Sequence, residues 1–69
     1  MPSTVIRDFA YDPRRGDLEV TFVSGRRYRY RHVPAVVVER FQRAISKGRF
    51  FNTRIRNRFA FEEIGETLH

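Results

Sequence analysis

The sequence has no cysteine, and this absence removes the usual covalent supports of a very small protein. Without thiols the chain can form neither a disulfide nor a thiolate metal site, so packing alone must stabilise the fold. Its 69 residues allow one domain, which we expect to span residues 1–69 with a core over about 4–59. A chain of this length buries only about 60% of its unfolded surface. Seven Phe and three Tyr must therefore supply much of the core.

Long apolar runs are also missing. No stretch approaches the roughly 18 apolar residues of a membrane span. No apolar region follows Met1 to Thr4, as it would in a signal peptide. We therefore expect a cytoplasmic protein that does not associate with membranes.

Groups that carry catalysis are scarce. The chain has two histidines, His32 and His69, and we interpret His32 as a strand-end residue rather than as a base. Asp8, Asp12 and Asp17 do not have the spacing of metal ligands, and no glycine-rich phosphate loop is present. We expect no enzyme activity, no metal and no cofactor.

Acidic residues are outnumbered by basic ones, eight to fourteen, which gives a net charge of +6. All the basic residues except Lys47 are arginines. The guanidinium group is a planar, five-donor fork that suits phosphate and carboxylate and stacks on flat rings. The composition therefore favours a phosphate-bearing polymer as partner. Surface arginines also keep small proteins soluble and form weak ion pairs, so charge alone leaves both interpretations open.

Three strands are predicted in the first half of the chain, over residues 4–11, 17–23 and 26–32. The first needs a β-bulge near Arg7 and Asp8, because its apolar side chains do not alternate strictly. Residues 12–16 have the Asp, Pro and Gly of a tight turn. A three-residue loop with Gly25 in the left-handed conformation joins the second and third strands, because a two-residue loop would separate their apolar faces.

This loop fixes the outward-facing pairs of the second and third strands. Glu19 is predicted to lie opposite Arg29, and Asp17 opposite Arg31. We therefore expect these two arginines to be partly neutralised and Arg27 to be the freest of the three. The same register puts Tyr28 and Tyr30 on the inner face. They could stack on unpaired bases, but packing in the core with their hydroxyls at the rim is the favoured interpretation.

Two helices are predicted in the second half. The first runs from about 34 to 46, with Ile45 widening its apolar stripe, and it ends at Gly48 in the left-handed conformation. The second covers about 49–59, with a buried stripe of Phe51, Ile55 and Phe59. The predicted fold class is α+β, an antiparallel three-stranded meander followed by two helices packed on one face (βββαα). The tail, residues 60–69, either docks through Phe61, Ile64 and Leu68 or frays.

Several short motifs follow one another in order between Thr4 and Phe59: Tyr11-Asp12-Pro13, Gly25, Tyr28-Arg29-Tyr30, Val33-Pro34, Ser46-Lys47-Gly48, Phe51-Asn52 and Ile55-Arg56. In their order and spacing they resemble the KTSC domain family, named for the C-terminus of certain lysyl-tRNA synthetases. The resemblance implies a bacterial or phage source, often a stand-alone protein, and no established activity. RNA binding has been suggested for the family through the synthetase connection. Phe59 departs from the pattern, in which tyrosine is commoner.

The strongest candidate site follows the break between the two helices. Free backbone N–H groups beside Gly48 favour an anion, and Lys47 and Arg49 add positive charge. Asn52 and Arg56 are four residues apart, so both side chains can reach one spot. That spot suits a phosphate or the carboxylate of a partner protein. The alternative is structural, with Asn52 holding the loop and Arg56 bonded to a backbone carbonyl or an acid.

We therefore predict a small stand-alone module that binds nucleic acid, RNA more than DNA, through phosphate contacts. The predicted anion-binding residues are Lys47, Arg49, Asn52, Arg54, Arg56, Arg58 and Arg27. Readout of base sequence is expected to be poor, because the aromatic side chains are needed in the core. The alternative is an interaction module for an acidic protein, or a homodimer in which the first or third strand pairs between two copies.

Overall fold

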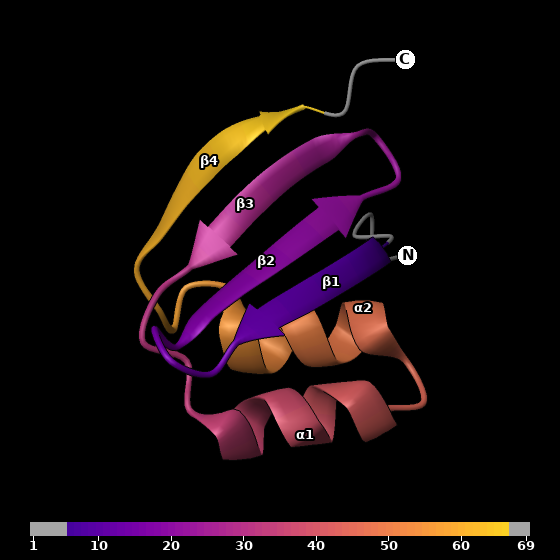
Figure 1. Cartoon of the computed structure of the whole chain (residues 1–69). Helices are drawn as coiled ribbons and strands as arrows, with labels where there is room; N and C mark the ends of the chain where they lie inside the picture. The colour runs from indigo at the N-terminus through magenta and orange to yellow at the C-terminus, as the bar shows by residue number, and fades with distance from the viewer. Residues whose placement is uncertain (1–5, 67–69) are drawn as a thin grey trace.

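The computed structural model describes residues 6–66, which form a four-stranded antiparallel sheet with helices on one face (Figure 1). The strands are β1 (Ile6–Asp12), β2 (Asp17–Phe22), β3 (Arg26–Tyr30) and β4 (Phe61–Glu66), and they lie side by side in that order. Between β3 and β4 the chain forms α1 (Ala35–Arg43), α2 (Lys47–Phe50) and a π-helix, η1 (Phe51–Ile55). The predicted α+β class is confirmed, but the predicted βββαα order lacks the fourth strand.

The predicted pairing of β2 with β3 is confirmed. Val20 lies opposite Tyr28, and Glu19 lies opposite Arg29. The three-residue loop between these strands closes with a 2.8 Å hydrogen bond from the Gly25 N–H to the Phe22 carbonyl. Gly25 has a φ of 96°, a conformation that a residue without a Cβ adopts at little cost.

The first hairpin also has the predicted irregularity. The register of β1 against β2 shifts between Ile6 and Asp8, as a β-bulge requires. In the following turn the Gly16 N–H donates to the Asp12 carbonyl at 2.8 Å, and the Asp12 side chain accepts from the Arg14 N–H at 3.0 Å. Residues 4 and 5 of the predicted strand lie outside the described residues.

The tail was predicted to dock or to fray; Phe61 does pack on Tyr30 of the core, but the strand formed by residues 61–66 was not predicted. They form β4, which pairs antiparallel with β3, with Tyr30 opposite Phe61 and Arg29 opposite Glu62. Backbone hydrogen bonding to β3 therefore holds this segment. Leu68 lies outside the described residues. Because β4 occupies the free side of β3, the sheet edges are β1 and β4, and the prediction that two copies could pair through the third strand is wrong.

The helical segment begins and ends differently from the prediction. α1 ends at Arg43 rather than near 46, and Ile45, predicted to extend its apolar stripe, is fully exposed. Gly48 is not left-handed; it lies inside α2, whose N-cap is Ser46. The second predicted helix is a turn of α-helix continued by η1, in which the Arg56 N–H donates to the Phe51 carbonyl five residues back at 2.8 Å.

The core lies between the helices and the inner face of the sheet. Leu18 and Val20 of β2, Phe41 of α1 and Ile55 of η1 are all 0% exposed. Phe51 is also buried, as predicted, whereas Phe59 is only half-buried. Packing of this kind positions η1 beneath the sheet and so sets the geometry of the surface described next. No helix in residues 6–66 is long and apolar enough to cross a membrane.

Candidate functional site

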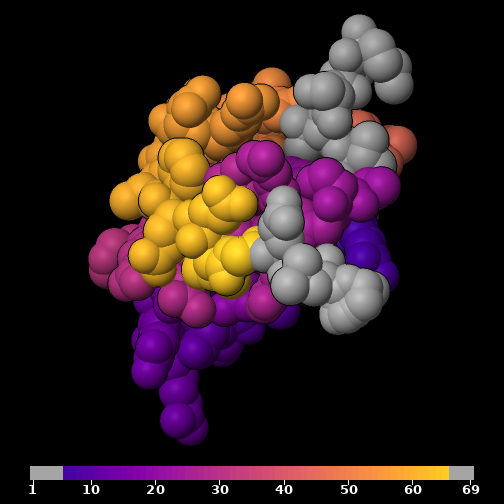
Figure 2. All heavy atoms as spheres, turned by 90° about the horizontal axis from the view of Figure 1, so that it is seen from above, coloured from indigo at the N-terminus to yellow at the C-terminus, as the bar shows by residue number. Residues whose placement is uncertain are grey.

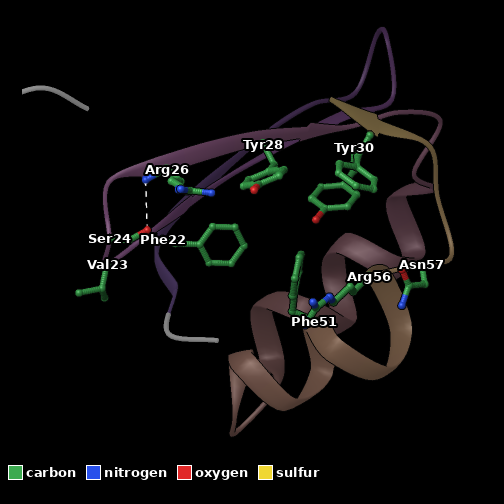
Figure 3. Close-up of a pocket in the computed structure, with 10 residues that line it drawn as sticks. Phe22, Val23, Ser24, Arg26, Tyr28, Tyr30, Phe51, Arg56 and Asn57 are labelled. Carbon is green, nitrogen blue, oxygen red and sulfur yellow. Dashed lines mark hydrogen bonds between the residues drawn. The ribbon is translucent and has the colours of Figure 1, made fainter. Parts of the chain in front are cut away.

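An aromatic pocket opens between η1 and the inner face of the sheet (Figure 3). Its volume is about 680 Å³, which is within the usual range for small-molecule sites. Side chains from β2, β3, β4, η1 and the loops beside them line it: Phe22, Val23, Ser24, Arg26, Tyr28, Tyr30, Phe51, Arg56, Asn57 and Phe61. We call this set the aromatic pocket.

The walls of the aromatic pocket are a connected set of rings. Tyr30 stacks on Phe61 of β4 with the ring centroids 5.4 Å apart, and it meets Phe51 of η1 edge-on at 5.3 Å. Phe22 meets Phe51 edge-on from the other side at 5.4 Å. Such pairs stabilise the fold by about 0.5–1.5 kcal/mol each beyond the area that they bury. The rings therefore belong both to the core and to the pocket wall.

Polar groups enter the aromatic pocket from two sides. Figure 3 shows the hydroxyl of Tyr30 projecting from β3 toward Phe51 and Arg56, and that of Tyr28 lying on the side of Phe22 and Arg26. Burial is the main cause that raises the pKa of Tyr30 to about 12, with Tyr28 adding to the rise and Arg56 opposing it. The Tyr30 hydroxyl is therefore protonated at neutral pH and can donate a hydrogen bond. No described residue accepts from or donates to the hydroxyl of either tyrosine.

Two residues of the predicted anion site meet as expected. The Arg56 guanidinium donates to the Asn52 side-chain oxygen at 3.5 Å, which is a long hydrogen bond between exposed groups. This contact leaves most of the donors of Arg56 for another partner, and the same side chain lines the aromatic pocket. The predicted alternative was that Arg56 bonds a backbone carbonyl or an acid. Within residues 6–66 the Arg56 side chain makes no such contact.

The predicted anion site at the helix start has less capacity than the sequence indicated. The Ser46 hydroxyl already accepts from the Arg49 N–H at 3.2 Å, so one of the free N–H groups is satisfied. The Lys47 ammonium is bonded to the Ala44 carbonyl at 3.1 Å. These contacts make Ser46 and Lys47 structural parts of the turn.

Three predicted cations of the helical segment remain exposed. Arg49, Arg54 and Arg58 form no ion pair with any residue of the described segment, 6–66. Residues 47–58 contain five cations and no acid: Lys47, Arg49, Arg54, Arg56 and Arg58. We call these five side chains the helical cations. Seen from above, the orange residues of the helical segment and the yellow residues of β4 are both visible at the surface (Figure 2).

The outer face of the sheet is mostly neutralised. Glu19 forms ion pairs with both Arg27 and Arg29, each at 3.2 Å. Glu62 of β4 continues the row with Arg29 at 3.2 Å and Arg31 at 2.9 Å. Arg27, predicted to be the freest arginine of this face, therefore has one ion pair, as Arg31 does, whereas Arg29 has two. Three arginines share two carboxylates, and we call this row the outer ladder.

The position of Glu62 explains a second difference from the prediction. Its hydrogen bonds and charge interaction with Arg31 lower the pKa of the Glu62 carboxyl, with Arg29 contributing less. Glu62 in turn raises the pKa of Arg31, to which Asp17 adds only a small charge effect. Asp17, the partner predicted for Arg31, is therefore secondary to an acid from β4.

The sequence did not indicate the aromatic pocket. Its far wall, Phe61, lies in the tail, and Asn57 and Arg26 lie in loops or strand ends that had no assigned role. One signal was present: Asn and Gly favour left-handed turns, and Asn57 with a φ of 67° reverses the chain after η1. Such a reversal returns the tail toward β3 and closes the pocket.

Comparison with known proteins identifies the relatives of this chain. The KTSC domain model matches residues 2–59. A crystal structure of a KTSC domain protein from Yersinia pestis superposes with a TM-score of 0.85 at 36% identity, covering 94% of each chain. An uncharacterized protein of Stutzerimonas stutzeri is 46% identical over 52 residues, which is 75% of this chain and 73% of that protein.

Longer proteins contain a matching segment. The lysine–tRNA ligase of Nostoc punctiforme is 39% identical over 61 residues, which cover 88% of this chain but 11% of the ligase. The corresponding ligase of a second Nostoc strain is 36% identical over 59 residues, 86% of this chain and 10% of the ligase. This chain thus spans about a tenth of the length of the ligases that it matches.

Proposed function

This chain belongs to the KTSC domain family, and from that premise we propose that it binds single-stranded nucleic acid through phosphate contacts. The observation that carries the proposal is the group of helical cations, of which Arg49, Arg54 and Arg58 have no acidic partner in residues 6–66. The outer ladder is largely neutralised and is therefore left out of the proposed contact surface.

The chemistry of the helical cations suits a polyanion. Four of the five are arginines, whose planar forks match the oxygen pairs of phosphate. Because residues 47–58 contain no acid, their charges are not cancelled within the segment. Arg27, included in the predicted site, is assigned to the outer ladder instead.

A single strand fits this surface better than a duplex. One of the helical cations, Arg56, lines the aromatic pocket, and single-strand binders combine positive grooves with ring surfaces. The name lysine–tRNA ligase, carried by relatives that contain a matching segment, supports RNA over DNA. Specificity for sequence is expected to be low, because contacts to phosphate carry no direct sequence information.

The first test is the salt dependence of binding to a single-stranded RNA. If four phosphates are neutralised, log Kd should rise with log salt with a slope of about 3. Replacing Arg54 and Arg58 with Glu should weaken binding at least about tenfold and reduce this slope, because contacts become repulsions. The matched control is Arg14→Glu with Arg15→Glu, which changes net charge equally in an exposed turn of the first hairpin.

The result that contradicts the proposal is a flat salt dependence, or no RNA or DNA binding at low salt. Equal weakening by the two double variants would show that net charge, and not the helical cations, attracts the RNA. Circular dichroism of both variants must show the fold of the parent protein, since all four arginines are exposed.

A second candidate function rests on the exposed edges and apolar side chains. Val23 is 61% exposed and Phe61 is 53% exposed, and β1 and β4 each have a free edge. An acidic protein or a second copy of the chain could add a strand at either edge. Sedimentation at increasing concentration distinguishes the homodimer, and a single monomeric species throughout contradicts it.

A further inference from the structure

We propose that the aromatic pocket holds one unstacked base of the bound strand, with an adjoining phosphate on Arg56. This inference rests on the proposed function and adds a base-binding subsite to it. It also revises the expectation that the aromatic side chains are fully occupied by the core.

One wall of the aromatic pocket is held by ring contacts and is also exposed at the surface. Phe61 is 53% exposed, although its ring stacks on Tyr30 and also contacts Tyr28 with centroids 5.7 Å apart. Opposite these rings, Phe51 lies on η1 at the base of the pocket (Figure 3). An exposed ring on the wall of a concave site is a surface on which a flat ligand can stack.

The charge of the aromatic pocket also favours this occupant. Its lining includes the exposed guanidinium of Arg56 and no acid. A cationic ligand is therefore disfavoured, and a ligand with a flat apolar part and an anionic part is favoured. A nucleotide has both parts in one unit, and Arg56 belongs also to the helical cations that would bind the rest of the strand.

The aromatic pocket also supplies hydrogen-bonding groups. The hydroxyls of Tyr28 and Tyr30 have no partner among residues 6–66, and both project into the aromatic pocket. Asn57 adds a side-chain amide, which both donates and accepts. These groups can form hydrogen bonds with the edge of an unstacked base, as proteins that recognise single-stranded RNA do.

Size is consistent with this occupant. The volume of about 680 Å³ is ample for a base with its sugar. Val23, in the loop after β2, lines the pocket and is 61% exposed, so the lining reaches the molecular surface there. The strand can therefore continue past the pocket while one base enters it.

Phe61→Trp provides the most direct probe. The chain has no tryptophan, so this change puts its only indole on the pocket wall and keeps a stacking surface. Two ligands are compared: hexauridylate, and an abasic strand with the same sugar–phosphate length. We expect hexauridylate to quench the indole fluorescence and to bind about 10- to 100-fold more tightly than the abasic strand, since stacking of a single base accounts for a factor of this order.

Phe61→Ala should reduce the affinity for hexauridylate to that of the abasic strand and leave abasic binding and its salt slope unchanged. The control is Val36→Ala, which removes a similarly exposed apolar side chain, 52% exposed, from α1 outside the pocket. It should alter neither affinity. The double variant Arg54→Glu with Arg58→Glu should lower the affinity for both ligands.

The outcomes separate the two claims. Equal affinities of the parent protein for hexauridylate and the abasic strand, both salt-dependent, overturn the base subsite and leave phosphate binding intact. Absence of binding to either ligand overturns the proposed function and the subsite with it. A hexauridylate preference that survives Phe61→Ala also overturns the subsite, because the bases would then be bound elsewhere.

Discussion

At the scale of single residues, Tyr30 connects the core to the aromatic pocket. Its side chain is buried among Tyr28, Phe51 and Phe61, while its hydroxyl faces the pocket. A buried phenol resists ionisation because the charged form loses its hydration. The same burial therefore maintains a hydrogen-bond donor in the pocket and makes the fold sensitive to alkali.

The raised pKa of Tyr30 predicts how stability depends on pH. The folded pKa of about 12 exceeds the ordinary value of 10.0, so the folded state holds this proton more tightly than the unfolded state. The stabilising contribution is complete below pH 10 and is lost as pH rises toward 12. Urea unfolding between pH 9 and about 12 should show a fall in the free energy of unfolding that is smaller in Tyr30→Phe. An identical fall in both proteins would contradict this account.

The residues of the candidate site were predictable to different degrees. The helical cations followed from composition and spacing, because helix faces repeat with a known period. The state of each cation did not follow, because pairing depends on which acids arrive from elsewhere. Glu62 comes from β4, and a partner 31 residues away from Arg31 leaves no local signal.

At the scale of elements, the pairing of β2 with β3 was predictable and that of β3 with β4 was not. A hairpin register follows from loop length and from which side chains must point inward. β4 joins β3 only after the whole helical segment, and Gly65 with a φ of 122° interrupts its alternation. The register of β3 and β4 also shifts between Arg27 and Tyr28, so no simple alternation exists to be read.

The helical segment shows how a cap can override periodicity. A single helix over 49–59 would align Phe51, Ile55 and Phe59, but α2 begins at Lys47 behind the Ser46 cap, and η1 ends at Ile55. In η1 the Arg56 N–H bonds to the carbonyl of Phe51, five residues back, and this wider turn changes the direction in which the following side chains point. Arg56 is consequently directed to the aromatic pocket rather than along a helix face.

The Ser46 cap gives a prediction for this element. Ser46→Ala removes the acceptor of the Arg49 N–H and should lower the free energy of unfolding by about 1 kcal/mol, a fall in Tm of about 4–8 °C for a domain of this size. Ser46→Asp keeps an acceptor and should stay close to the parent protein. Thermal unfolding by circular dichroism measures both. Equal losses in the two variants would show that the cap is not what holds α2.

At the scale of the whole molecule, the charge distribution separates two faces. The outer ladder couples three arginines to two glutamates across β2, β3 and β4. The helical cations lie on the other layer, and one of them, Arg56, lines the aromatic pocket. Exposed ion pairs of the ladder kind contribute little to stability, but they remove the ladder as a strong site for polyanions.

The net charge of +6 therefore overstates the unpaired positive charge on the outer face of the sheet. It understates how much of the unpaired charge is concentrated in the helical segment. Composition predicted a polyanion partner but could not assign it to a face. The position of η1 beneath the sheet, together with β4 as the last strand, brings Arg56 of the helical cations to the ring surfaces of the aromatic pocket.

Mapping the contact surface by NMR tests this account most directly. Backbone amide shifts of the intact protein are followed as hexauridylate is added at low salt. We predict that the largest changes fall on residues 47–58 and on Tyr28, Tyr30 and Phe61, with little change at Arg14 and Arg15. Changes concentrated on the first hairpin, or on Glu19 and the outer ladder with residues 47–58 unaffected, would contradict it.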